Sequence, residues 1–411
     1  MKQITREQTT MLALLGNILF GRQTVPDGEL DWQSVMREAD EQAVLPLVYQ
    51  AAKGYLPAEL AEQLAGRVDE ILVNDMLLEF EHVELHQIMT EAGVDYVVMK
   101  GSASAAYYPD PLLRTMGDVD FLVREEDVAR GGEALERHGF RPKKDEGSPI
   151  HRAYARSEDP RHDSVWELHW RPNGIPRNEV GQKLAALLHD SLETAVLRET
   201  ENGAYRVPDD RHHGLMILLH TIRHMLHTGV GARHLCDWAA FVSHFSGTEF
   251  RDLFERDFRA LGLWETAAAL TAVCVRYLSM PDPGWQGHVP DELTEALMGD
   301  ILEGGNFGSK DEERINASVL YVNSEDGTLG KKGKLSSLFS ALSDRARKSF
   351  PAVREHPALL PAAWVCVAAR HLLRVAQGRR PGLHVGRMLA SANDRSALYR
   401  KLLIFENEDI E

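Results

Sequence analysis

The chain is poor in cysteine, and its three cysteines form no pattern that binds a metal or builds a disulfide framework. Cys236, Cys274 and Cys366 are far apart, odd in number and without the paired spacing of a zinc site. We therefore expect neither a zinc knuckle nor a disulfide-stabilised scaffold. Such cysteine usage is typical of the reducing cytoplasm, where we expect the protein to be located.

Long apolar runs are also missing, so no segment is expected to cross a bilayer. The first apolar stretch, Met11 to Phe20, is short, is broken by Gly16 and Asn17, and precedes no small-residue cleavage site. This pattern predicts no secretory signal and no membrane partner.

Positive charge is scarce relative to negative charge: the chain has 46 Lys and Arg residues and 62 Asp and Glu residues, which gives a formal net charge of −16. Affinity for nucleic acid rests largely on neutralising phosphates with Lys and Arg, so we expect no general DNA binding. Basic residues prevail only at 331–348, where an RNA or another acidic acceptor could dock. Ordinary solvated surface is the simpler interpretation of that stretch.

The 411 residues are enough for two or three domains. Amphipathic helices are predicted at 5–20 and 30–53, and a long one at about 60–92. Short strands are predicted at 94–99, 118–123, 140–143, 151–156 and 165–170, with a helix at 125–138, and helices dominate from 177 onward. We predict an α/β (α+β) fold: an N-terminal helical cap (1–69), a core with a small mixed sheet (70–175) and a large helical C-terminal region (176–411).

The segment from Val94 to Ser102 combines a strand, a glycine and a helix start. Lys100-Gly101-Ser102 ends the strand where a helix over 103–108 is predicted to begin. Glycine allows close backbone approach, and the first N–H groups of a helix have no internal partner, so this junction can bind an anion. Ser102 would add a hydroxyl donor and Lys100 a charge, although a lysine can also simply end a strand.

Asp118 and Asp120 are two residues apart on the next strand and therefore project from one face. Paired carboxylates repel each other in a half-buried strand unless a cation neutralises them. Mg²⁺ (or Mn²⁺) is the expected ion, because it takes one or two carboxylates and completes its shell with water and substrate phosphates. A lone Asp-x-Asp is also common on exposed strands and turns, so the pair gains weight only from the Gly-Ser junction before it and the Glu-bearing strand after it.

Over about residues 70 to 240 the chain resembles the nucleotidyltransferases of the DNA polymerase beta type, in particular the bacterial branch labelled uncharacterised nucleotidyltransferase. The resemblance is carried by Lys100-Gly101-Ser102 and by Arg114-Thr115-Met116-Gly117-Asp118-Val119-Asp120. It implies that Gly101 and Ser102 bind a nucleoside triphosphate and that Asp118 and Asp120 hold the metals. A third carboxylate follows on a later strand in that superfamily, and Glu167 matches it.

The other candidate nucleotide contacts are Arg114, His169 and Arg233. His169 shares a strand face with Glu167 and could orient that carboxylate or the acceptor. Arg114 could instead hold its loop by pairing with Asp110 or Asp118. Arg233-His234-Leu235-Cys236-Asp237 resembles the Arg and Asp that the uncharacterised branch carries after a histidine-bearing helix, so Arg233 could reach the triphosphate or pair with Asp237.

Within the stretch 211–244, where helices are predicted, His220, His224 and His227 fall on one helical face. Three such histidines can ligate a transition metal, but the spacing is not His-Glu-x-x-His. We favour packing or nucleotide-contact roles for them.

The sequence thus predicts an Mg-dependent nucleotidyltransferase. Its catalytic and metal-binding residues are Asp118, Asp120 and Glu167, its donor is an NTP, and its acceptor hydroxyl belongs to a small molecule, protein or RNA. The alternative is a nucleotide-sensing or protein-binding module without turnover. A histidine-centred metallohydrolase is a third interpretation.

Overall fold

The computed structural model describes residues 3–143, 148, 150–156, 164–311, 313–318, 320–322, 328–329, 342–343, 346–347, 349–350, 352–376 and 385–406. Residues 331–341, 344, 345 and 348 of the basic stretch lie outside the described residues. Acceptor docking there therefore stays a prediction.

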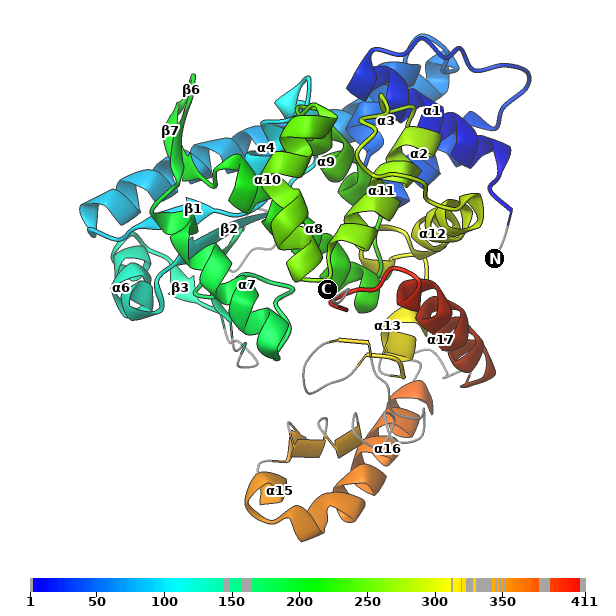
Figure 1. Ribbon diagram of the computed structural model, residues 1–411. Helices are drawn as coiled ribbons and strands as arrows, with labels where there is room; N and C mark the ends of the chain where they lie inside the picture. Colours follow the sequence, from blue (N-terminus) through cyan, green and yellow to red (C-terminus); the bar gives the residue numbers. More distant parts are fainter. Residues whose placement is uncertain are drawn as a thin grey trace.

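The central sheet is small and mixed, as the sequence predicts. Its order is β1-β2-β5-β4-β3. The strands are β1 (Tyr96–Val98), β2 (Asp118–Val123), β3 (Arg141–Pro142), β4 (His151–Ala155) and β5 (Val165–His169). β2 and β5 are parallel, and all other neighbours are antiparallel. With its many helices, the protein has the expected α+β fold (Figure 1).

Alternation along β2 divides its side chains between two cores. Val119, Phe121 and Val123 pack with α4 (Ala58–Glu91) and α6 (Val128–Arg137) in one hydrophobic cluster. Leu122 belongs instead to the large cluster of the helical region, and Asp118 and Asp120 share its parity on the strand. The two aspartates therefore project from the face of the sheet that is turned toward the helical region.

The N-terminal helices are α1 (Arg6–Phe20), α2 (Trp32–Glu41) and α3 (Leu45–Ala52). The single helix predicted at 30–53 is wrong, because the chain breaks between α2 and α3. Ala43 there has a φ of 56°, and Pro46 lies at the start of α3. Residues of α1 to α3 share one hydrophobic cluster with α8 (Asp210–Leu226), α9 (Ala232–Val242) and α11 (Trp264–Tyr277), beside which they lie in Figure 1.

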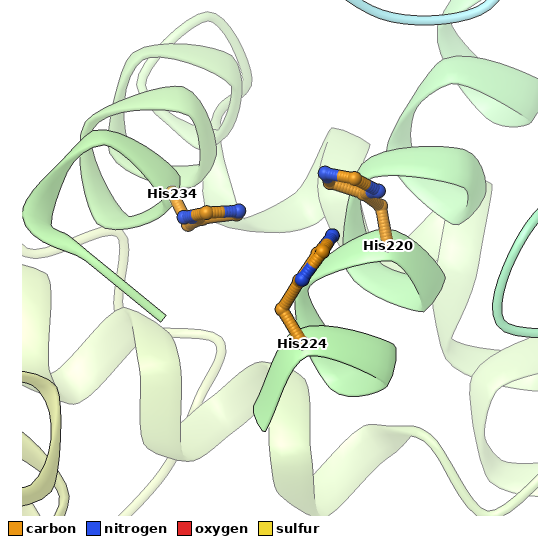
Figure 2. Close-up of side chains that lie close together, drawn as sticks. All are labelled: His220, His224 and His234. Atoms are coloured by element: carbon orange, nitrogen blue, oxygen red, sulfur yellow. The ribbon is translucent and has the colours of Figure 1, made fainter. Parts of the chain in front are cut away.

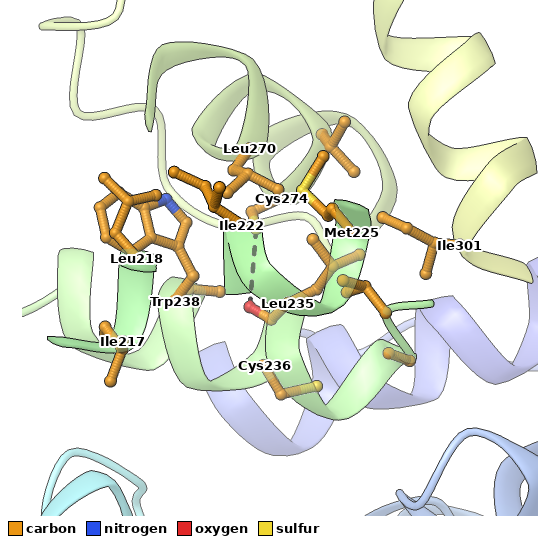
Figure 3. Close-up of a cluster of buried hydrophobic side chains, with 14 of the residues drawn as sticks. Ile217, Leu218, Ile222, Met225, Leu235, Cys236, Trp238, Leu270, Cys274 and Ile301 are labelled. Atoms are coloured by element: carbon orange, nitrogen blue, oxygen red, sulfur yellow. Dashed lines mark hydrogen bonds between the residues drawn. The ribbon is translucent and has the colours of Figure 1, made fainter. Parts of the chain in front are cut away.

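The interior of the helical region is dense and apolar. Figure 3 shows Leu218 and Ile222 of α8 packed with Leu235 and Trp238 of α9 and with Leu270 of α11. All three cysteines are free, and buried Cys274 Sγ donates to the Leu235 carbonyl oxygen at 3.7 Å. This core holds α8 and α9 in the fixed relation on which the histidines and arginines below depend.

The other helices and strands of the described residues follow in chain order. They are α5 (Ser102–Ala105), α7 (Glu179–His189), the hairpin β6 (Val196–Thr200) and β7 (Gly203–Val207), α10 (Gly247–Ala260), α12 (Asp291–Gly304), α13 (Glu313–Ser318), α15 (Ala352–Glu355), α16 (Leu360–Ala376) and α17 (Val385–Arg400), with 3-10 turns η1 (Pro111–Leu113), η2 (Glu125–Asp127), η3 (Asp190–Leu192), η4 (Asn306–Gly308) and η5 (Pro357–Leu359). In Figure 1, α15 and α16 extend away from the main body. Within the described ranges, no helix combines the length and apolarity needed to cross a membrane.

Candidate active site

The three carboxylates predicted from the sequence lie together. β2 and β5 are parallel neighbours, and their register places Asp120 directly beside Glu167, while Asp118 lies two residues earlier on the same face. One oxygen from each carboxylate falls within 4.8 Å of the others. Asp120 is buried, Glu167 is half-buried and Asp118 is exposed, so the group runs from the interior to the surface.

Asp120 is neutralised by two cationic side chains of the protein itself. Lys100 Nζ lies 2.7 Å from Asp120 Oδ2, and His169 Nε2 lies 2.9 Å from Asp120 Oδ1 and 3.0 Å from Glu167 Oε2. The sequence predicts a phosphate contact for Lys100, yet here its ammonium pairs with a carboxylate. β1 delivers it there, because the Met99 N–H donates to the Asp120 carbonyl oxygen across the ladder.

His151 is a member of this cluster that the sequence analysis missed. It faces His169 across the antiparallel pair β4 and β5, with ring centroids 4.8 Å apart. Its Nε2 lies 3.9 Å from Glu167 Oε1. Two strands thus place imidazoles around one carboxylate, which only the register of the sheet could reveal.

The charges in the cluster shift the pKa values of the two aspartates in opposite directions. Repulsion from Asp120, followed by burial, raises the pKa of Asp118 to about 6. Burial opposes ionisation of Asp120, but Lys100 and His169 hold the pKa of that carboxyl well below its usual range. Although burial disfavours both cations, Asp120 raises the pKa of Lys100 and of His169. Lys100 and Arg233 oppose the rise at Asp118 only in part, so Asp118 is the aspartate of the pair whose charge is less well compensated within the protein.

These residues fit a divalent cation. A metal ion would supply the positive charge that Asp118 lacks, and Asp118 with Glu167 offers oxygens at the accessible side of the cluster. Each carboxylate oxygen has two lone pairs, so the contacts from Lys100 and His169 do not exhaust Asp120. Asp118, Asp120 and Glu167 are the residues that would hold Mg²⁺.

The Gly-Ser junction differs from the predicted form. Gly101 has a φ of 53° and a ψ of −115°, a left-handed conformation that favours glycine. The helix predicted at 103–108 is only the single turn α5, which is too short to act as a helix dipole. Ser102 is buried, and its carbonyl oxygen accepts a 2.7 Å hydrogen bond from Arg198 Nη1. Phosphate binding by Gly101 and Ser102 stays a prediction.

Arg114 has a buried partner that neither sequence-based alternative named. Its Nε and Nη2 donate to the two oxygens of Asp237 at 3.0 and 2.7 Å, and the Tyr108 hydroxyl donates to Asp237 Oδ1 at 2.7 Å. The expected pairings with Asp110 or Asp118 are wrong. The charge of Arg114 is therefore balanced by Asp237 and needs no phosphate. Both oxygens of Asp237, with which Arg233 could have paired, accept hydrogen bonds from Arg114.

Two half-buried arginines close to the carboxylates carry no ion pair within the described residues. Arg233 Nη1 donates to the Thr115 carbonyl oxygen at 3.2 Å, and its guanidinium lies 5.3 Å from the ring centroid of Phe307. Burial lowers the pKa of Arg223, and the charges of Glu167 and Asp120 oppose that effect. Arg223 could not be predicted from the sequence, because its nearness to the sheet depends on how α8 packs.

The histidines of α8 are joined by one from α9. His220 and His224 lie with His234, not with His227, which follows the end of α8 as its C-cap. Figure 2 shows the three rings turned toward one another. Gly231, just before α9, lets the backbone of Asn306 pack closely against it, because a Cβ there would lie 2.8 Å from Asn306 Cα.

Strand order, register and the carboxylate cluster define a nucleotidyltransferase-like core. A family described as uncharacterised nucleotidyltransferase matches residues 28–279. The chain therefore belongs to the uncharacterised nucleotidyltransferase family. This membership supports nucleotidyl transfer in general and a nucleotide substrate. No protein with a curated function matches the chain.

Proposed function

We propose that the protein is an Mg-dependent nucleotidyltransferase that moves a nucleoside monophosphate from an NTP to an acceptor hydroxyl and releases pyrophosphate. The observation that carries this proposal is the group of three carboxylates on the parallel strands β2 and β5. Its order along the chain resembles the DNA polymerase beta type of site. Mg²⁺ (or Mn²⁺) held by this group would neutralise charge on the attacking and leaving oxygens of the phosphoryl displacement.

Side chains of the protein would accept the proton of the acceptor hydroxyl and bind the triphosphate. The acceptor oxygen forms a bond to the α-phosphorus while the bond to the bridging oxygen of pyrophosphate breaks. Glu167 accepts the proton of the acceptor hydroxyl, and His169 orients Glu167 through their 3.0 Å contact. Arg223 and Arg233 have no carboxylate partner in the described part of the chain, so they suit the triphosphate.

The pairing of Lys100 with Asp120 favours one alternative, a nucleotide-binding module without turnover. Uncompensated carboxylates are costly unless a cation is bound, but here Lys100 and His169 neutralise Asp120 within the protein itself. The presence of all three carboxylates is therefore weaker evidence for catalysis here than in a site where no basic side chain pairs with them.

Incubation with each α-labelled NTP and Mg²⁺ separates the two functions. Transfer predicts label in the protein, RNA or small-molecule fraction together with released pyrophosphate, and loss of both with Asp118→Asn. A binding module predicts Mg-dependent nucleotide affinity in calorimetry without pyrophosphate. If no NTP binds and no pyrophosphate is released, the proposal is overturned.

A further inference from the structure

Three imidazoles from two helices meet close enough to Lys100 for its charge to act on all three. The ring centroids of His220 and His224 are 4.4 Å apart, and each lies 5.4 Å from that of His234. One ring nitrogen of each histidine falls within 4.8 Å of the others. Figure 2 shows that the rings converge across the space between α8 and α9.

The nitrogens that converge there lack ordinary partners. Neither ring nitrogen of His234 makes a hydrogen bond of good geometry, although the Gly231 carbonyl is close enough to act on its pKa. His220 Nδ1 is likewise unpartnered. His234 is only 2% exposed. Buried polar atoms are normally satisfied and an unsatisfied one is destabilising, so these unpartnered nitrogens favour a further ligand at this place.

His224 is held in the form that a metal ligand needs. Its Nδ1 lies 2.8 Å from the hydroxyl oxygen of Thr228, one turn further along the chain. This contact fixes the ring and leaves Nε2 available, which is how a second partner commonly orients a ligating histidine.

The rings are also kept neutral. Burial, and then the charges of Lys100, Arg233 and neighbouring histidines, lowers the pKa of His220. Burial and Arg233 do the same for His234. A neutral imidazole presents one lone pair, which a metal ion accepts, and one N–H.

We propose that His220, His224 and His234 bind one divalent transition metal ion, with Zn²⁺ as the best-suited ion. Imidazole nitrogens favour such ions over Mg²⁺, which prefers the oxygens of Asp118, Asp120 and Glu167. Among the described residues no fourth histidine, cysteine or carboxylate joins the group. Three protein ligands leave one position open, as in catalytic zinc sites.

The charge balance defines what fills the open position. Three neutral imidazoles leave the charge of the ion uncompensated, and Arg233, Arg223 and Lys100 add positive charge nearby. An anionic oxygen, from hydroxide or from a phosphate, relieves that repulsion. The site is thus distinct from the carboxylate site in ligand type and in the metal it selects.

Metal analysis of the full chain, purified with a tag that contains no histidine, tests the site. After dialysis against Co²⁺ or Zn²⁺ and desalting, we expect about one metal ion per chain, and for Co²⁺ the visible absorption of a tetrahedral complex. His220→Ala and His234→Ala should each lose the metal and the absorption. His227→Ala, a matched change at the end of the same helix, should keep both.

Two further measurements keep the test decisive. Zn²⁺ should raise the melting temperature of the wild type but not that of His234→Gln. This variant retains the size and polarity of the side chain and replaces the alanine variants if they unfold. Asp118→Asn should retain the Co²⁺ absorption, so a failure of the nucleotidyltransferase proposal would not remove this site. Substoichiometric metal in the wild type, or equal metal in His220→Ala and His227→Ala, would overturn the inference.

Discussion

Arg114 and Asp237 form a bidentate ion pair that joins the loop before β2 to helix α9, more than a hundred residues later. Both side chains are buried. The pair therefore fixes β2, the strand of the candidate site, against the helix that carries Arg233 and His234. Its role is structural, and it holds the two candidate sites in one arrangement.

Breaking this pair should cost much more than breaking a surface pair. Asp237→Asn leaves the Arg114 guanidinium buried without its counter-charge, and we expect a loss of about 3–5 kcal/mol in the free energy of unfolding. Urea denaturation followed by circular dichroism measures it. Glu295→Gln, which breaks the partly exposed pair with Arg276, is the control and should cost about 1 kcal/mol or less. Equal losses would mean that the buried pair does not fix the arrangement.

Asp120→Asn should abolish metal-dependent turnover and also destabilise the metal-free protein. From the sequence, repulsion between Asp118 and Asp120 predicts that the variant gains stability. The structure reverses this expectation, because Lys100 and His169 would lose their shared counter-charge. A double-mutant cycle with Lys100→Met, read by thermal unfolding without metal, should give a coupling of about 0.5–3 kcal/mol. Additive effects would contradict the pairing.

The sheet is the part of the fold that local sequence describes well. Asp118 and Asp120 alternate with buried Val119 and Phe121, so their shared face follows from the period of the strand alone. The meeting of Asp120 with Glu167 also needed the strand order, which the resemblance supplied and the register shows. The break at Ala43 could not be predicted, because a positive φ at alanine reflects packing and not local preference.

Contacts between distant elements set the limits of prediction. Helical periodicity correctly predicted that His220 and His224 lie together, but it added His227 as the third member. Periodicity alone does not indicate that α8 ends before His227, or that α9 brings His234 to the same place. Arg223 and the partner of Arg114 were missed for the same reason. Local patterns fix which face a residue occupies, whereas the packing of α8 and α9 decides what that face meets.

Asp75 on α4 provides a pH test of the packing beside β2. Its Oδ1 accepts from the Met116 N–H at 2.8 Å, and burial raises its pKa from 3.8 to about 7. A carboxyl with a raised folded-state pKa binds its proton more tightly when folded. Its stabilising contribution is therefore complete below about pH 4 and declines as the pH rises toward about 7.

Asp75→Asn should remove this pH dependence. A shift of about 3 pKa units corresponds to ~4 kcal/mol as an upper limit. The variant should thus gain stability relative to wild type between pH 5 and pH 8, as measured by chemical denaturation at each pH. Glu70→Gln, a matched change on the exposed part of the same helix, is the control. A constant difference between Asp75→Asn and wild type would show that the pKa of folded Asp75 does not lie in this pH range and would contradict the prediction.

The last prediction concerns Glu167, whose substitution separates binding from chemistry. Glu167 is half-buried at the accessible side of the cluster and contacts His169 at 3.0 Å, whereas Asp120 lies deeper and is held by Lys100. If Glu167 accepts the acceptor proton or positions the metal that activates it, Glu167→Gln should still bind nucleotide through Arg223 and Arg233. Turnover should fall by roughly 100-fold or more, the scale of general-base groups.

Calorimetry of nucleotide binding and a transfer assay on the same preparation provide the two readouts. The matched control is Glu179→Gln at the start of α7, a carboxylate outside the cluster, which should change neither. If affinity falls together with turnover, Glu167 is a primary ligand for nucleotide or metal and not a base. Unchanged turnover would remove Glu167 from the mechanism. The proton of the acceptor would then need another recipient, and His151, whose Nε2 lies 3.9 Å from Glu167 Oε1, would be the next residue to test.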